Sequence, residues 1–159
     1  MAMHTWFECK IRYEKVMENG MQKKVTEPYL VDALSFTEAE ARIIEEMTPF
    51  ISGEFTVSDI KRANYSELFP SDEESADRWF KCKLIFITLD EKSGAEKKTS
   101  TQVLVQAADL RDAVKKLDEG MKGPMADYQI GMVSETPLMD VYPYSAEPND
   151  KPEFDPSKA

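Results

Sequence analysis

The chain has 159 residues, a hydrophobic fraction of 42% and a net charge of −10, which fits one compact domain or two closely packed halves. No apolar run approaches the roughly 18 residues of a membrane span, and the first residues have neither a basic start nor an apolar stretch, so the sequence predicts a cytoplasmic protein without a signal peptide. The acidic balance disfavours nonspecific nucleic-acid binding and leaves only a local basic face for an anionic partner.

A tandem repeat organises the chain. Residues 6–10, Trp-Phe-Glu-Cys-Lys, return as Trp-Phe-Lys-Cys-Lys at 79–83, and later matches keep an offset of 73 or 74 residues. Such self-similarity indicates a duplicated structural unit. The expected divisions are repeat 1 at 5–70, an acidic linker at 71–77, repeat 2 at 78–144 and a tail at 145–159. The prolines and low apolar content of the tail predict disorder.

Each repeat opens with a predicted β-hairpin. Apolar residues alternate with polar ones in both copies, and Asn19-Gly20 and Ser93-Gly94 are turn-forming pairs between the two strands. The inward-facing residues are then Phe7, Cys9, Ile11, Tyr13, Tyr29, Val31 and Ala33 in repeat 1, and Phe80, Cys82, Leu84, Phe86, Val103, Val105 and Ala107 in repeat 2.

The parity of these residues tests the hairpin register. Opposed residues share a face, so Cys82 can oppose Val105 across a two-residue turn at Ser93-Gly94. Cys9 and Val31 have equal parity instead, which requires an odd loop length or a bulge in repeat 1. We therefore expect the two hairpin loops to differ by one residue.

A helix and a third strand follow in each repeat. Ser35 with Glu38 forms a capping-box pattern, and Asp109 is the equivalent cap, each contributing about 1 kcal/mol. The apolar stripes expected to face the core are Phe36, Ala39, Ile43 and Met47, and Leu110, Ala113, Leu117 and Met121. The third strands run through Phe55, Val57 and Ile60, and through Tyr128, Ile130 and Val133, and short final strands include Leu68-Phe69 and Val141-Tyr142.

These elements predict an α+β fold. It is a tandem duplication of a ββαβ(β) unit, with antiparallel sheet, one helix per repeat packed on one face and a pseudo-twofold relation between the repeats.

The residues that usually carry catalysis are sparse. The single histidine, His4, precedes the first strand and has no neighbouring metal-ligand pattern, and the sequence has no phosphate loop or dinucleotide fingerprint. Strand parity turns Cys9 and Cys82 inward as small apolar side chains, away from a nucleophilic role. We expect no catalytic residue, metal or cofactor, and an enzyme is the less favoured class.

The sheet face away from the helices carries the candidate ligand-binding residues. Tryptophan beside lysine on an open sheet could stack a base while cations contact phosphates. The candidates are Trp6, Lys10, Arg12, Trp79, Lys81 and Lys83. The alternative is that the tryptophans are covered by the other repeat or by a second subunit. Repeat 2, with Lys81 in place of Glu8, is the better place for an anionic ligand.

Two strings, Trp-Phe-Glu-Cys-Lys at 6–10 and Leu-Ser-Phe-Thr-Glu-Ala-Glu-Ala-Arg at 34–42, resemble an uncharacterised family of small proteins from Bacteroides-type bacteria and their phages or mobile elements. The resemblance covers residues 5–144 and implies a cytoplasmic, phage-borne accessory protein without known chemistry.

The sequence leaves several functions open. The first hypothesis is a non-enzymatic binding protein with a protein partner or a homo-oligomeric assembly. The alternatives are a single-stranded nucleic-acid-binding protein, a small-molecule-sequestering oligomer and an enzyme. The acidic tail around Glu153-Phe154-Asp155 could recruit a partner or only solubilise the chain.

Overall fold

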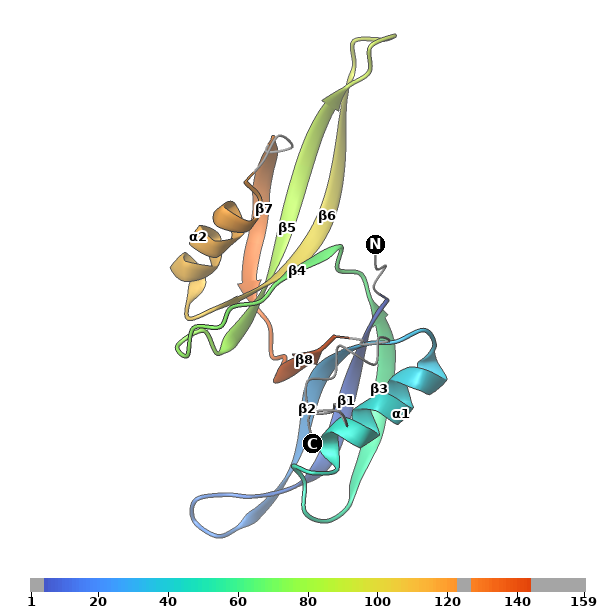
Figure 1. Ribbon diagram of the computed structural model, residues 1–159, viewed down its shortest axis with the longest axis vertical. Coiled ribbons are helices and arrows are strands. Elements are labelled where there is room, and N and C mark those ends of the chain that lie inside the picture. The colour runs from blue at the N-terminus through green and yellow to red at the C-terminus, as the bar shows by residue number, and fades with distance from the viewer. Residues whose placement is uncertain (1–4, 123–126, 144–159) are drawn as a thin grey trace, which may run out of the picture. The chain divides into compact units, whose positions relative to one another are not determined.

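The computed structural model of the chain describes residues 5–122 and 127–143 and divides into two compact units. Figure 1 labels their elements. Unit 1 contains β1 (Trp6–Val16), β2 (Gln22–Asp32), α1 (Phe36–Met47), β3 (Phe55–Ala63) and β8 (Asp140–Tyr142). Unit 2 contains β4 (Glu67–Phe69), β5 (Arg78–Leu89), β6 (Glu96–Ala107), α2 (Leu110–Gly120) and β7 (Tyr128–Glu135).

Each unit is a four-stranded sheet with one helix, which confirms the predicted α+β fold and its duplication. The strand order is β3-β1-β2-β8 in unit 1 and β4-β6-β5-β7 in unit 2. The long hairpins are antiparallel, whereas β8 runs parallel to β2 and β4 runs parallel to β6. The sheets are therefore mixed: the predicted antiparallel pairing holds for the long hairpins, whereas the two short strands add parallel pairs.

The short strands also separate the sequence repeats from the structural units. β4 follows β3 along the chain but completes the sheet of unit 2, and β8 follows β7 but completes the sheet of unit 1. The predicted final strand of each repeat thus exists, and it pairs with the second strand of the other repeat. Each repeat depends on the other for its fourth strand, a feature that the repeat pattern does not reveal.

The hairpins confirm the predicted difference in loop length. In unit 1, Val16 pairs with Gln22 around a five-residue loop, and in unit 2, Leu89 pairs with Glu96 around a six-residue loop. The extra residue accounts for the change of repeat offset from 73 to 74 between the paired strands. The predicted two-residue turn is wrong, because Val103 rather than Val105 opposes Cys82.

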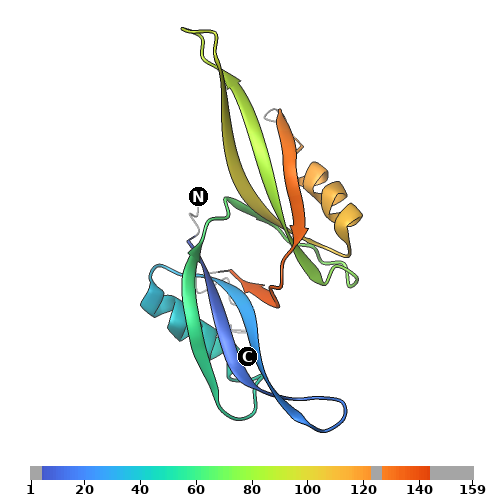
Figure 2. The same cartoon turned by 180° about the vertical axis from the view of Figure 1, so that it is seen from behind.

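The two cores contain the predicted inward-facing strand residues, but Phe36 and Leu110, predicted to face the core from the helices, are 46% and 52% exposed. In unit 1, α1 packs Ala39, Ile43 and Met47 against the β1–β2 face that carries Phe7 and Val31. The core of unit 2 contains the corresponding residues Phe80, Cys82, Leu84, Val103, Val105, Ala107, Ala113 and Leu117. Figure 2 shows the opposite faces of the sheets, which the helices leave uncovered, and the hairpins that extend past the helix ends.

The predicted helix caps are confirmed. The Ser35 hydroxyl accepts a hydrogen bond from the Glu38 backbone N–H, and the Asp109 carboxylate accepts one from the Asp112 backbone N–H. Each cap satisfies one of the backbone donors that a helix start leaves without an intrahelical partner. The caps therefore fix where each helix begins after the second strand of its hairpin.

Candidate functional site

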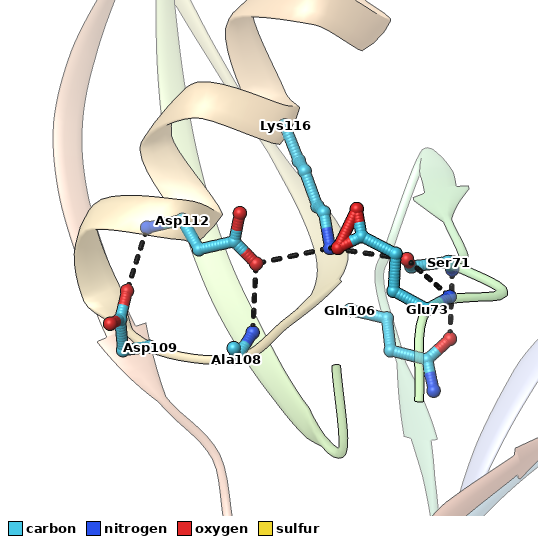
Figure 3. Close-up of polar contacts among 7 residues, drawn as sticks. All are labelled: Ser71, Glu73, Gln106, Ala108, Asp109, Asp112 and Lys116. Atoms are coloured by element: carbon cyan, nitrogen blue, oxygen red, sulfur yellow. Dashed lines mark hydrogen bonds and ion pairs between the residues drawn. The ribbon is translucent and has the colours of Figure 1, made fainter. Parts of the chain in front are cut away.

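A polar network connects the first turns of α2 to the segment after β4 (Figure 3). Lys116 Nζ lies 3.0 Å from an Asp112 carboxylate oxygen and 3.2 Å from one of Glu73, and it donates to the Ser71 hydroxyl at 3.1 Å. The Ser71 backbone N–H donates to the Gln106 side chain. Because Ser71 and Glu73 come shortly after β4, this network holds the end of β4 against unit 2, whose sheet β4 completes.

Unit 1 contains an equivalent arrangement made by different residues. Arg42, at the position equivalent to Lys116, donates to the backbone oxygens of Asp32 and of Pro143, the residue directly after β8. In both units a basic side chain on the helix therefore holds the segment beside the exchanged short strand. The presence of this arrangement in both copies indicates a structural role for the network in Figure 3.

The candidate residues on the open sheet faces differ in accessibility. Trp6 is 3% exposed and Trp79 is 5% exposed. Lys10 and Lys81 are half-buried, whereas Arg12 and Lys83 are exposed. The buried indoles offer no free ring face for base stacking, as in the alternative in which the tryptophans are covered. The ligand-binding role of the six residues as a set stays a prediction.

Both cysteines lie in the cores, as predicted. Burial, with added repulsion from Glu8, Asp59 and Glu40, raises the pKa of the Cys9 thiol to about 12. Burial raises the pKa of the Cys82 thiol to about 11. At neutral pH both side chains are therefore protonated thiols, and a nucleophilic cysteine needs the thiolate.

A tyrosine cluster distinguishes unit 1 from unit 2. The Tyr13 hydroxyl donates to a Glu27 carboxylate oxygen at 2.8 Å, and the Tyr29 hydroxyl donates to the same oxygen at 3.4 Å. Lys15 Nζ lies 3.6 Å from the other Glu27 oxygen. The ring of Tyr29 stacks on that of Tyr142 of β8, with 6.2 Å between centroids.

The phenols of this cluster are held in their neutral form. Burial, followed by the hydrogen bond to Glu27, raises the pKa of Tyr13 to about 12. Burial also raises the pKa of Tyr29, and burial together with the charges of Asp140 and Glu46 raises the pKa of Tyr142 to about 12. The three phenols are therefore hydrogen-bond donors at neutral pH and do not act as general bases.

An open groove of about 910 Å³ lies beside this cluster. One wall is the distal part of the β1–β2 hairpin, and the other is the connection from α1 to β3. The lining residues are 12–16, 22, 24 and 50–56. Tyr13 and Lys15 belong to both the tyrosine cluster and the groove, so the Glu27 carboxylate orients two side chains of the groove wall.

Exposed apolar side chains gather at the same end of unit 1. Phe50 on the groove is 76% exposed and Val16 is 65% exposed, and in the hairpin loop Met17 and Met21 are 39% and 67% exposed. Of these side chains, Val16 and Phe50 line the groove. Large exposed apolar patches occur at interaction sites, and flexible methionines are common on binding surfaces that accommodate varied partners. The groove therefore combines an apolar rim with an ordered polar wall.

Unit 2 lacks this combination. The positions equivalent to Tyr13, Glu27 and Tyr29 are Phe86, Thr101 and Val103, and Phe69 replaces Tyr142. Each replacement removes a phenol or a carboxylate while the strands keep their pairing. The scaffold is thus duplicated, whereas the charged and phenolic groups of the cluster occur in unit 1.

The sequence matches, over residues 5–144, a family described as a domain of unknown function (DUF4494). The chain belongs to this family. No curated protein and no solved structure matches it. Since the match spans both repeats, the DUF4494 domain is the whole duplicated fold rather than a single repeat.

Residues 5–122 and 127–143 contain no group of three or more His, Cys, Asp or Glu side chains that could hold a metal ion. None of the helices described is long and apolar enough to cross a membrane.

Of the residues that line the groove, Arg12 was among the predicted binding residues, whereas Tyr13, Lys15 and Phe50 were not, because the prediction rested on features that the repeats share. The informative signal was divergence between equivalent positions, such as Tyr13 against Phe86. Phe50 gave a second signal, because it follows the helix-ending Pro49 and has no place in the helical apolar stripe. Neither signal shows by itself that hairpin and loop form one groove.

Proposed function

We propose that this DUF4494 protein is a non-enzymatic binding protein whose groove in unit 1 holds an extended segment of a partner protein. The observation that carries the proposal is Phe50, which lies on the groove with 76% of its surface exposed. A folded chain gains nothing from leaving a phenylalanine in water, whereas a buried aromatic anchor is a common source of binding energy.

The charges of the groove indicate the chemistry of the segment. Arg12, Lys15 and Lys24 oppose Glu14 and Glu54, which gives three positive and two negative charges and a net charge of +1. The whole chain carries −10. A segment with an aromatic side chain and flanking carboxylates would place the ring against Phe50 and its charges beside the cations.

The geometry favours binding over catalysis in this groove. The phenol of Tyr13 has a raised pKa and already donates to Glu27, so it is poorly suited to accept a proton. Its neighbour Lys15 is paired with the same carboxylate. These contacts hold side chains in place, which lowers the entropy lost when a partner binds.

The test is a titration of fluorescently labelled peptides followed by anisotropy. The probe peptide carries phenylalanine between two acidic residues, and matched peptides carry alanine between acids or phenylalanine between lysines. Phe50→Ala should weaken binding of the probe at least tenfold, which corresponds to about 1.4 kcal/mol. The matched control is Leu89→Ala, since Leu89 is 68% exposed on the hairpin of unit 2.

The control fixes how the titration is interpreted. Both substitutions remove an exposed apolar side chain, so neither should change the free energy of unfolding by more than about 0.5 kcal/mol. Equal affinity of Phe50→Ala and the unsubstituted protein for the probe would rule out the groove as the site. If the segment comes from a second copy of the chain, Phe50→Ala should also lower the mass of the assembly.

A single-stranded nucleic-acid partner is the second candidate, and the observation that favours it is the basic open face of unit 2. Lys83 is exposed there and Lys81 is half-buried. With both indoles buried, phosphate contacts would have to supply the affinity, so binding should fall steeply with salt. A labelled oligonucleotide whose affinity falls with Lys83→Glu but not with Phe50→Ala would favour this candidate.

An accessory role on a phage or mobile element belongs to the same proposal. A chain that binds a partner without chemistry of its own suits such a role, and the partner captured by the groove would identify the process.

A further inference from the structure

We propose that the C-terminal segment of the chain, residues 144–159, docks into the groove of unit 1 with Phe154 against Phe50. This inference rests on the proposed function, since it assumes that the groove accepts a peptide. If the chain's own segment fills the groove, the partner has to displace it before binding, which provides a means of regulation.

The chemistry of the segment complements the groove. Glu153 and Asp155 flank Phe154, an aromatic between two carboxylates. Residues 144–159 carry four acidic and two basic side chains, a net charge of −2, against the net +1 of the groove. The apolar ring meets the exposed Phe50 and Val16, while the carboxylates meet the cations on β1 and β2.

The place where the described chain ends allows the contact. β8 ends at Tyr142, which pairs with Val31, and Arg42 holds the Pro143 oxygen, so the segment leaves from unit 1 itself. Lys24 of the groove lies seven residues from Val31 along β2, or about 23 Å. Twelve residues separate Tyr142 from Phe154 and span up to about 40 Å when extended, which leaves length for the chain to turn back.

Tethering makes the contact favourable even if the segment binds weakly. A short linker gives an effective concentration of about 1 mM, so a segment with a dissociation constant of about 0.1 mM in free solution would occupy the groove most of the time. The prolines at 148, 152 and 156 restrict the backbone and reduce the entropy lost on docking. A free partner then competes against a high local concentration.

The experiment compares NMR spectra of the full chain with those of two tail variants, Phe154→Ala and the matched control Lys158→Ala. Undocking of the segment should shift the amide signals of residues 12–16 and 50–56 in Phe154→Ala and leave them unchanged in Lys158→Ala. Phe50→Ala should in turn shift the signals around Phe154. Changes confined to the neighbours of residue 154 would overturn the inference.

Peptide binding separates this inference from the proposed function. If the segment competes, Phe154→Ala should bind the labelled probe about tenfold more tightly than the unsubstituted chain, as expected from the ratio of effective concentration to dissociation constant. Equal, Phe50-dependent affinities in both chains would overturn docking of the segment and leave the groove as a partner site. Absence of probe binding in both chains, with unchanged groove signals, would overturn both proposals.

Discussion

Unit 1 and unit 2 share a scaffold but differ in the surface beside the distal part of the hairpin. Both use an aromatic–cysteine strand, a capped helix and a borrowed short strand. Unit 1 then adds three phenols, the Glu27 carboxylate and an exposed Phe50. Both copies fold in the same way, so the shared fold does not require residues that occur in only one of them. The difference directs attention to the groove of unit 1.

The largest expected effect tests whether the two cores are equivalent. Phe7 and Phe80 are 0% and 2% exposed, and truncating either to alanine should lower the free energy of unfolding by about 3–5 kcal/mol. Phe7→Ala should cost more, because Phe7 also meets the Phe36 ring edge-on at 4.9 Å and lies under the Arg62 guanidinium.

Urea unfolding measures both values. A larger loss in the free energy of unfolding for Phe80→Ala than for Phe7→Ala would show that the contacts of Phe7 with Phe36 and Arg62 do not decide the difference between the cores. Phe7→Leu and Phe80→Leu should preserve the same order at smaller cost, and they serve if the alanine variants do not fold.

A smaller effect tests how each helix meets the borrowed strand. A Cβ atom added at Gly120 would lie 2.7 Å from the Phe69 ring of β4, so Gly120→Ala must displace that ring. Overpacking costs about 1–3 kcal/mol and the better helix propensity of alanine returns up to about 1 kcal/mol, so we expect a net loss of about 1 kcal/mol.

The equivalent position in unit 1 is Glu46, where alanine should change the free energy of unfolding by less than about 0.5 kcal/mol. Thermal unfolding of both variants checks this contrast. A stabilised Gly120→Ala protein would mean that the Phe69 ring moves aside without cost.

The smallest effect concerns the Lys116–Asp112–Glu73 network of unit 2 and its dependence on pH. The hydrogen bond from the Ala108 backbone N–H, followed by the contact with Lys116, lowers the pKa of Asp112. A depressed pKa in the folded state means that the stabilisation is present above the unfolded value of about 3.9 and is lost as pH falls through the folded value.

Asp112→Asn should therefore lower the melting temperature slightly at neutral pH, and the difference from the unsubstituted protein should shrink as pH falls below about 4 and vanish once Asp112 is protonated in the folded state. Melting curves over this pH range check the expectation. A difference that persists at the lowest pH would assign the effect to the amide geometry rather than to the charge.

Much of the fold could be predicted because it depends on local periodicity. Alternation identified the strands, Ser35 and Asp109 identified the helix starts, and residue parity identified the unequal hairpin loops. The candidate site could not be predicted in the same way. Residue parity placed Trp6 on the open face of its strand, yet whether other chain segments cover that face is a tertiary property, and Trp6 is buried.

By itself, the sequence determined the elements, their facing and the duplication, since these follow from side-chain spacing at the period of a strand or a helix. Tertiary structure alone decided which sheet each short strand joins, because backbone pairing across a long separation leaves no local pattern. It also decided that Tyr13 and Phe50, on the hairpin and on the connection from α1 to β3, line one groove. A groove depends on how separate elements approach one another, and the spacing of residues within an element does not specify that approach.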